Sequence, residues 1–429
     1  MVVLLFNVVG YLTRAAGFNY NNGCFHVNGN NNINNAGLSR GMVLFIKYTH
    51  QMKSYKNIYF LICKYENLFL AWRKARKHKT KKQYVLDFEK DLVQSIVTLQ
   101  NELLLHSYRP KPLKTFTLRD PKTRKISVSD FRDRIIHHAI CNLIEPIFEE
   151  VFISDSYANR KGKGTLAALK RLKSFMKKVS KNKTIIHKFG KKRIFRGFYL
   201  KGDIQRYFDS INHEMLLKII NKRIKDKRLL HLIKTILSNN NPNLVGLPLG
   251  NLTSQFFANV YLNELDQFVK HKLKAKYYIR YVDDFVILHS DESKLAEFKE
   301  KIGDFLQTKL LINLHPEKSL IKPISRGIEF LGFRNFYDYR LLRKRNIRRT
   351  YGKLRDLERK YKLGEIGYDT VYDYLEGWSA YVSHSNTHKR RLEIAHKIQN
   401  KFPTAISTKE VNRIIKEEKK QNNSRISAK

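Results

Sequence analysis

Residues 278–290 read YIRYVDDFVILHS, in which two adjacent acidic residues separate two apolar runs rich in β-branched and aromatic side chains. This pattern predicts a β-hairpin whose tight turn presents the carboxylates of Asp283 and Asp284. Two neighbouring like charges are costly to bury unless a cation compensates them. Mg²⁺ is suited to this, because it prefers oxygen ligands and keeps open positions for phosphate oxygens. The alternative is a solvated Asp-Asp turn, which the apolar flanks disfavour.

A third acidic residue, Asp203, follows a short apolar strand in FYLKGDIQRYFDSINHEML, residues 198–216. If this strand neighbours the 278–290 hairpin in one sheet, three carboxylates meet and can hold two metal ions. One ion would lower the pKa of an attacking hydroxyl, and the other would stabilise a phosphate leaving group. The alternative is that Asp203 caps a turn, which is the role we expect for Asp209 beside Asn212.

A loop with a glycine leads into a helix in GLPLGNLTSQFFANVYLNELD, residues 246–266. Gly250 allows a ligand to approach the backbone closely. Gln255 can donate to, or accept from, a base or a nucleic-acid backbone. The residues expected to cap the helix are Asn251, Thr253 or Ser254. Taken alone, the stretch is also typical of an ordinary junction between a loop and an amphipathic helix.

The charge balance indicates a polyanionic partner. The chain has 429 residues, with 83 Lys and Arg against 38 Asp and Glu, so its formal net charge is +45. Nucleic acid is the expected partner, because each neutralised phosphate releases condensed counterions. An anionic membrane surface is the alternative, and it is disfavoured because the basic residues are spread over most of the chain and do not flank an apolar segment.

Cysteine usage and the start of the chain indicate an intracellular location without a membrane partner. The three cysteines, Cys24, Cys63 and Cys141, form no CxxC pair and no zinc-spaced cluster. A reducing compartment fits this usage. The apolar residues 1–12 lack a basic flank and are fewer than the ~20 that span a bilayer, so we expect neither signal nor anchor.

Local patterns predict several further elements. Residues 115–130 contain two β-rich runs around 120–122, which predicts a hairpin. Apolar periodicity predicts one helix over 213–238. Residues 408–429 are mostly charged and polar, which predicts a loose tail.

The order of these stretches resembles the palm of reverse transcriptases. The Asp203 strand, the Gly250 loop and the YVDD hairpin are followed by Lys318 and by GIEFLGF, residues 327–333. DRIIHHAICNLIEPIFEEVFISDSYANRKGKGTLAAL, which starts at Asp133, is similar to the fingers of bacterial reverse transcriptases related to group II introns. The resemblance covers nearly all of the chain after Met52. It implies an α+β right-hand polymerase with fingers, a palm (an antiparallel sheet packed on helices) and a helical thumb.

The resemblance divides the chain into five segments. They are residues 1–51, an Asn-rich extension that is disordered or a translated template repeat; 52–195, N-terminal helices and fingers; 196–340, the palm, with fingers helices at about 213–245; 341–400, the helical thumb; and 401–429, a basic tail. The implied partners are template RNA, an RNA/DNA hybrid and dNTPs, with two Mg²⁺ ions as cofactors.

The resemblance also implies a role for each matching position. Asp203, Asp283 and Asp284 would bind the Mg²⁺ ions, with Lys318 as general acid near the leaving pyrophosphate. Phe208 would be the steric gate that excludes a ribose 2′-hydroxyl. Residues expected to contact the nucleotide are Arg124, Lys125, Arg134, Phe208, Leu249, Gly250 and Gln255. Residues expected to contact template or primer are Arg160, Lys163, Gly327, Phe330 and Gly332. A solvated face is the alternative for each basic residue.

Residues 249–255, LGNLTSQ, depart from the usual pattern of QG followed by SP. Leu249 stands in place of glutamine and Gln255 in place of proline. This variation resembles the reverse transcriptases of diversity-generating retroelements, as do SYANRKGKGT and the opening at Met52. Such enzymes copy a template-repeat RNA with errors at adenines, and the cDNA replaces a variable region of a target gene. Leu249 cannot make the polar contact of a glutamine to the nascent pair, which would loosen geometry checking.

The same resemblance implies a small basic accessory protein that forms a ring-shaped oligomer, and a bacterial, archaeal or phage-encoded chain that works in the cytoplasm. It also offers a second meaning for residues 10–42, which are rich in asparagine. Asparagine codons are adenine-rich, so this stretch is a template repeat read in frame, with Met52 near the functional start, or a disordered extension. A near-copy of its DNA that differs mainly at adenines would decide for the first.

Three other interpretations stay open. A group II intron maturase usually carries a larger maturase region and often a Cys/His endonuclease, and no zinc-spaced cysteines follow the thumb here. A retron polymerase would show NAxxH and VTG signatures, which are absent from the expected places. An inactive RNA-binding scaffold has no need for clustered acids in a basic groove, so the intact aspartates argue against it.

Overall fold

The computed structural model describes residues 54–119, 123–189, 192–239, 243–402 and 405–426. Ser54–Lys429 forms one compact unit, separate from Met1–Lys53. The predictions made for residues 1–51 therefore lie outside the described residues.

Four N-terminal helices pack against one another and against the long helix α7, Phe131–Glu149. They are α3 (Ile58–Cys63), α4 (Tyr65–Arg76), α5 (Gln83–Glu89) and α6 (Leu92–Leu104). Leu68 on α4 is fully buried, and the side chain of its neighbour Asn67 donates to the Ala139 carbonyl of α7 at 3.1 Å. Apolar stripes on helices need such a partner, because burial of apolar area is what stabilises them.

The predicted hairpin at 115–130 is confirmed. Strands β1 (Lys114–Leu118) and β2 (Arg124–Val128) are antiparallel, with Lys114 opposite Val128. A second antiparallel pair, β3 (Ile185–Phe189) and β4 (Lys192–Phe195), lies further along the chain.

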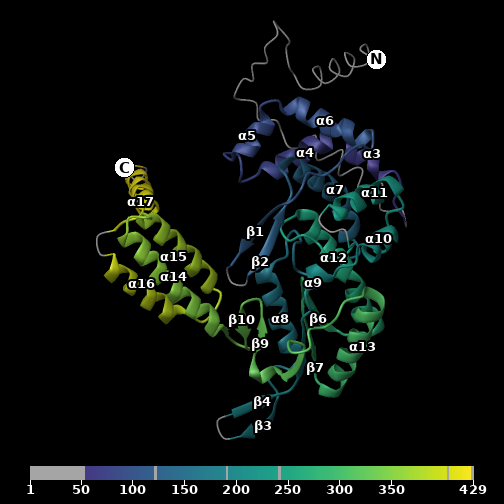
Figure 1. Cartoon of the computed structure of the whole chain (residues 1–429). Helices are drawn as coiled ribbons and strands as arrows, with labels where there is room; N and C mark the ends of the chain where they lie inside the picture. The colour runs from purple at the N-terminus through teal and green to yellow at the C-terminus, as the bar shows by residue number, and fades with distance from the viewer. Residues whose placement is uncertain (1–53, 120–122, 190–191, 240–242, 403–404, 427–429) are drawn as a thin grey trace. The chain divides into compact units, whose positions relative to one another are not determined.

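A four-stranded antiparallel sheet carries the acidic residues, and two of its strands, β6 and β7, are labelled in Figure 1. Its strands are β5 (Phe198–Gly202), β6 (Tyr277–Tyr281), β7 (Asp284–His289) and β8 (Leu320–Pro323), in the order β6-β7-β5-β8. The strand that precedes Asp203 is thus the neighbour of the YVDD hairpin, as the sequence predicted.

Helices cover both faces of this sheet. They are α8 (Thr165–Val179), α12 (Leu252–Gln267) and α13 (Glu292–Leu310). Ile279 packs in one apolar cluster with Leu172 of α8, whereas its neighbour Tyr278 donates through its hydroxyl to Asp266 of α12 at 2.7 Å. Because successive strand residues point to opposite faces, α8 and α12 lie on opposite sides of β6. The predicted α+β class, with an antiparallel sheet packed on helices, is confirmed.

The region predicted as one helix over 213–238 contains two. They are α10 (His213–Asn221) and α11 (Lys227–Ser238), and the short helix α9 (Tyr207–Ser210) precedes them. The break occurs because Asp226 accepts from Arg228 N and Leu229 N and so starts a new helix. The intervening Ile224 pairs with Tyr55 in an isolated bridge.

The C-terminal part begins with a small sheet and continues as a helical bundle. The sheet has the order β11-β10-β9, with β9 (Ile328–Phe330), β10 (Phe333–Asn335) and β11 (Arg340–Leu342). The bundle helices are α14 (Lys344–Lys362), α15 (Tyr368–Val382) and α16 (His388–Lys401). Leu357, Val371 and Ile394 share its buried core.

The loose tail expected at 408–429 is wrong for most of its length, since Thr408–Ile426 forms helix α17. Tail residues bind acidic partners on α15: the backbone Thr408 N donates to Asp369 at 2.7 Å, Lys409 pairs with Asp373 at 2.7 Å, and Arg413 pairs with Glu376. A charged segment with fixed partners need not be loose. Among the described helices none is both long and apolar enough to cross a bilayer.

A buried histidine on α7 makes the stability of the fold depend on pH. Burial, together with the charges of His138 and Arg134, lowers the pKa of His137 from 6.5 to about 3. Its Nδ1 lies 2.9 Å from Thr253 Oγ1 at the start of α12. The folded state therefore resists protonation between pH 6.5 and about 3, while the unfolded chain accepts the proton.

We expect stability to fall as pH drops below 6.5, with His137 accounting for about 2 kcal/mol at pH 5. Denaturant unfolding at pH 7.5 and 5 measures it. His137→Gln should reduce the loss between the two pH values by this amount, since glutamine does not titrate. An equal loss in both proteins would contradict the assignment.

Candidate active site

A tight turn between β6 and β7 carries the acidic pair. Val282 adopts a left-handed backbone, with φ of 57°, which sharply reverses the chain. β7 then begins at Asp284, and Gly202 at the end of β5 lies opposite Phe285. The next position in this antiparallel register sets Asp203 level with Asp284.

The glycine before Asp203 is required by packing. A Cβ added to Gly202 would lie closer than 3.0 Å to three ring carbons of Phe285, an approach that real Cβ atoms do not show. The Phe285 ring is fully buried and cannot move aside freely. Gly202 therefore lets β5 approach β7 closely enough to set the two acidic positions side by side.

We expect Gly202→Ala to destabilise the fold by about 1–3 kcal/mol and to reduce polymerase activity at least tenfold, because overpacking displaces Asp203. Thermal unfolding and primer extension measure the two effects. Gly352→Ala is the matched control, because Gly352 lies in α14 with nothing within 4 Å of its added Cβ. Phe285→Leu should partly rescue Gly202→Ala, and equal activity in Gly202→Ala and wild type would contradict this account.

The acidic residues influence one another electrostatically. Burial, together with the charges of Asp203 and Asp284, raises the pKa of Asp283 to about 6. Burial also raises the pKa of Asp284, opposed by Lys201. Groups that perturb one another in this way are close in space and are typical of functional sites.

Two lysines contact these carboxylates. Lys318 Nζ lies 2.8 Å from Asp203 Oδ2, and Lys201 Nζ lies 3.2 Å from Asp284 Oδ1. Asp284 Oδ1 is nevertheless buried without a hydrogen bond. Lys318 was predicted beside the reaction centre, and the structure brings it to Asp203.

The donor set suits a hard divalent cation, although the ligands are not gathered here. Within the described part of the chain, no group of three or more His, Cys, Asp or Glu side chains is placed to hold a metal ion. The three carboxylates offer only oxygen ligands, which Mg²⁺ prefers, and the partner of the buried Asp284 Oδ1 is the Lys201 ammonium at 3.2 Å. For a metal ion to bind, Lys201 and Lys318 would have to release Asp284 and Asp203.

The position of Phe208 is fixed by its backbone. It belongs to α9, and its carbonyl accepts from Leu247 N at 2.7 Å. The neighbouring Tyr207 is buried and donates to the Ala258 carbonyl of α12, while the half-buried Phe208 ring packs edge-on to Tyr207 at 5.5 Å. Asp209 is exposed and makes no cap, because Asn212 caps α10 by accepting from Met215 N.

The 246–251 loop is attached to the fingers hairpin. Ser127 N of β2 donates to the Leu249 carbonyl at 2.8 Å. Gly250, with φ of 123°, would bring an added Cβ within 3.0 Å of Ile126 and Val128. Leu249 therefore lies alongside β2, which also carries Arg124.

Asn251 occupies the N-cap position of α12, as predicted, but the expected side-chain cap is not formed. Asn251 Oδ1 accepts from Ser129 N and Oγ, and Thr253 contacts His137, so α12 begins without a side-chain cap. Ser254 is buried, and Gln255 is exposed in the first helical turn.

The predicted basic contacts divide into two groups. Arg124 and Lys125 are exposed on β2, and the Arg124 charge lowers the pKa of Asp283, so the structure brings it near the acids. Arg134, Arg160 and Lys163 donate within the fingers instead. Their acceptors are the Ser129 carbonyl for Arg134, Glu149 with two backbone carbonyls for Arg160, and the Ser154 carbonyl for Lys163.

The predicted primer grip is a turn between β9 and β10. Leu331 and Gly332 have positive φ values of 50° and 85°. Phe330 is fully buried in the apolar cluster that includes α8, so only the backbone there can face a primer. Gly327 is held close to the ring of Phe336.

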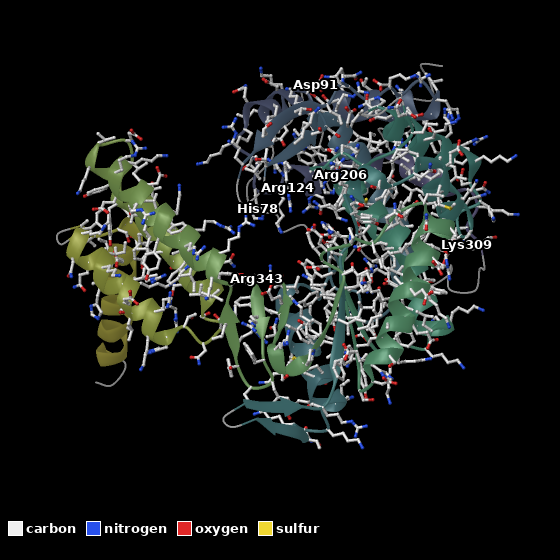
Figure 2. The ribbon with its side chains drawn as sticks, turned by 60° about the horizontal axis from the view of Figure 1, so that its bottom comes forward. His78, Asp91, Arg124, Arg206, Lys309 and Arg343 are labelled. Carbon is white, nitrogen blue, oxygen red and sulfur yellow. The ribbon has the colours of Figure 1, made fainter. Side chains whose placement is uncertain are left out.

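Two basic residues near the acids were missed by the sequence analysis. Lys201 precedes Asp203 by two positions on β5, and strand alternation is a signal that could have identified it. Arg343, labelled with Arg124 in Figure 2, immediately precedes α14. It lowers the pKa of Asp284 and pairs with Glu329 at 3.6 Å. No local pattern could have placed Arg343 there.

Sequence comparison defines the class of protein. Residues 112–335, just over half of the chain, match the family described as reverse transcriptase (RNA-dependent DNA polymerase). The chain belongs to this family and is an RNA-directed DNA polymerase. Reverse transcriptase domains generally use divalent metal ions.

Similar proteins include group II intron products. The chain is 26% identical over 299 residues to the protein YkfC of Escherichia coli, covering 60% of this chain and 73% of YkfC. It is 27% identical over 321 residues to the group II intron-encoded protein LtrA of Lactococcus lactis, covering 58% of this chain but only 50% of LtrA. The chain thus spans about half the length of LtrA.

Among solved structures, apo telomerase of Candida tropicalis truncated from its C-terminal domain has a TM-score of 0.42 at 13% identity, over 57% of this chain and 59% of that one. Telomerase of Candida albicans has a TM-score of 0.40 at 12% identity, over 55% of this chain and 46% of that one.

Proposed function

We propose that this polymerase makes cDNA from a template-repeat RNA, with Asp203, Asp283 and Asp284 as the ligands of two Mg²⁺ ions. The observation that carries the proposal is the strand register, in which Gly202 lies opposite Phe285, so that the next position brings Asp203 beside Asp284 in a chain of the reverse transcriptase family. Bound Mg²⁺ would lower the pKa of the primer 3′-hydroxyl and offset charge on the leaving pyrophosphate.

Residues of the chain itself would bind the triphosphate, position the primer end and exclude nucleotides with a 2′-hydroxyl. Arg124 and Lys125, both exposed on β2, would hold the triphosphate. Lys318, which contacts Asp203, would neutralise or protonate the pyrophosphate. Phe208 would exclude a 2′-hydroxyl, and the 327–332 backbone would position the primer end. Arg134, Arg160 and Lys163 would act indirectly, by fixing the fingers that present these groups.

The diversity-generating function rests on LGNLTSQ and its position. Leu249 is hydrogen-bonded through its carbonyl to β2, on the hairpin that also carries Arg124. An apolar side chain there offers the nascent pair no polar contact, and apolar pockets discriminate by only about 1–3 kcal/mol. Loose geometry checking would follow, with errors opposite template adenines.

The test is cDNA synthesis by the full chain on an RNA template with Mg²⁺ and dNTPs, with and without a co-expressed small basic accessory protein. Sequenced cDNA with errors clustered at adenines supports both the polymerase and the retroelement role. Faithful cDNA removes the retroelement role and favours a group II intron-type or retron-type enzyme. The likeness to LtrA is the observation behind the group II alternative. An absence of cDNA, even with cognate RNA and the accessory protein, favours an inactive RNA-binding relative.

We expect Leu249→Gln to lower the adenine error frequency severalfold, because glutamine restores a polar contact at the nascent pair. Deep sequencing of the cDNA measures it. Leu105→Gln is the matched control, since Leu105 is 77% exposed at the end of α6. An adenine error frequency that Leu249→Gln leaves unchanged rules out this explanation.

A further inference from the structure

A fully buried ion pair adjoins the turn that carries Asp283 and Asp284. Arg280 on β6 and Asp266 on α12 both have side chains with 0% exposure. The guanidinium donates to both carboxylate oxygens, through Nε at 2.7 Å and Nη2 at 2.6 Å. A buried pair of this kind is often no more stabilising than apolar residues of the same size. Stability alone therefore does not explain its presence.

The same guanidinium reaches the turn itself. Arg280 Nη1 donates to the Val282 carbonyl at 3.0 Å, immediately before the peptide nitrogen of Asp283. Val282 is β-branched and has φ of 57°, a backbone conformation that such residues rarely adopt. A strained residue persists only where its surroundings hold it in place. Here the bond from Arg280 holds it.

Other residues fix the guanidinium in turn. Asn259 on α12 accepts from Arg280 Nη1 at 3.2 Å, and its amide donates to the Ala158 carbonyl at 2.8 Å. Tyr278 donates its hydroxyl to Asp266 Oδ1 at 2.7 Å. The guanidinium thus has a partner on α12 for each of its three nitrogens, and one orientation that satisfies them all.

We propose that Arg280 is a positioning residue, which Asp266 and Asn259 orient so that its bond to the Val282 carbonyl sets the direction of the two acidic side chains. This inference rests on the proposed function of those acids as metal ligands. It predicts that disturbing Asp266 loosens the turn and weakens the response to Mg²⁺, although Asp266 itself does not reach the reaction centre.

The test compares Asp266→Asn and Arg280→Lys with wild type. Lysine keeps the charge but cannot bond both Asp266 oxygens and the turn carbonyl together. Asp133→Asn is the matched control, because Asp133 is also fully buried and accepts from Tyr108 Oη and Lys111 N in the fingers. Activity is measured as a single-turnover rate per active site, counted by burst amplitude, so that unfolded protein does not contribute.

For Asp266→Asn we expect the rate to fall about 10–100-fold, because small misplacements of reacting groups have effects of this size. The Mg²⁺ concentration for half-maximal rate should rise severalfold, while the KM for dNTP stays within about twofold of wild type. The rate and the half-maximal Mg²⁺ concentration of Arg280→Lys should lie between those of Asp266→Asn and wild type. Asp133→Asn should lower the melting temperature without changing the rate per active site.

A second readout does not depend on activity. Hydrogen exchange at the 281–285 amides should be faster in Asp266→Asn than in wild type, and unchanged in Asp133→Asn. If wild type makes no cDNA, the proposed function fails, and the exchange rates alone decide whether the pair holds the turn. Unchanged exchange at the turn in Asp266→Asn overturns the positioning role.

Val282→Gly supplies an independent check, because glycine adopts positive φ without strain. It should partly restore the rate in the Asp266→Asn background, so that the two substitutions are non-additive. Strict additivity in the double mutant would show that the pair does not act through the turn.

Discussion

Replacing Asp283 and Asp284 together by asparagine is expected to reduce the rate of nucleotide addition by more than about 10³-fold, because the neutral amides cannot hold the Mg²⁺ ions that both ends of the transfer need. Affinity for an RNA/DNA hybrid should change by less than about twofold, since that affinity comes from phosphate contacts elsewhere. Single-nucleotide extension and hybrid anisotropy measure the two quantities.

The same substitution should stabilise the fold. The pKa of Asp283 rises to about 6 on folding, so its charged form disfavours the folded state as pH rises above the usual value of 3.8. At pH 7.5 the free energy of unfolding of the Asp283→Asn variant should therefore be about 1–3 kcal/mol higher than that of wild type. Asp209→Asn, at an exposed position of α9, is the matched control for both measurements. Substantial primer extension by the double variant would show that nucleotide addition does not depend on Asp283 and Asp284.

Phe208→Ala is expected to reduce the preference for dNTPs over rNTPs by about 10–100-fold, because the smaller side chain leaves room for a 2′-hydroxyl. The ring is half-buried, and the Phe208 carbonyl accepts from Leu247 N, so the backbone should keep its position after truncation. The ratio of kcat/KM for each dNTP to its rNTP measures this preference.

The matched control for the gate is Phe60→Ala, at a phenylalanine that is 51% exposed on α3. It should leave the preference unchanged. If the Phe208→Ala enzyme still rejects rNTPs as strongly as wild type does, another residue must exclude the 2′-hydroxyl.

The acidic cluster is tolerated because basic residues from four separate segments oppose it. Lys201 comes from β5, Arg124 from β2, Lys318 from the segment before β8, and Arg343 from the residue before α14. Adjacent carboxylates without such neighbours would be protonated or would unfold the site.

The order of motifs along the chain was enough to predict the α+β polymerase class and the pairing of the Asp203 strand with the YVDD hairpin. The individual strands and the turn rest on local signals: the alternation of apolar residues, the turn chemistry and the position of each acid at a strand end. Such signals lie in consecutive residues, so they do not depend on contacts with distant parts of the chain. The polymerase class and the pairing of these strands rest on the resemblance of the motif order to reverse transcriptases.

Other features depended on contacts between residues far apart in the sequence. Asn251 fits the pattern of a helix cap, yet its oxygen accepts from Ser129, because the fingers offered a better-placed donor. The tail at 408–426 is mostly charged and polar, yet it forms a helix whose Lys409 and Arg413 pair with acids on α15. The partner of Arg280 is Asp266, fourteen residues earlier and on another element. Long-range pairing depends on how helices and strands pack, and packing depends on the whole chain at once, so no single stretch of sequence contains it.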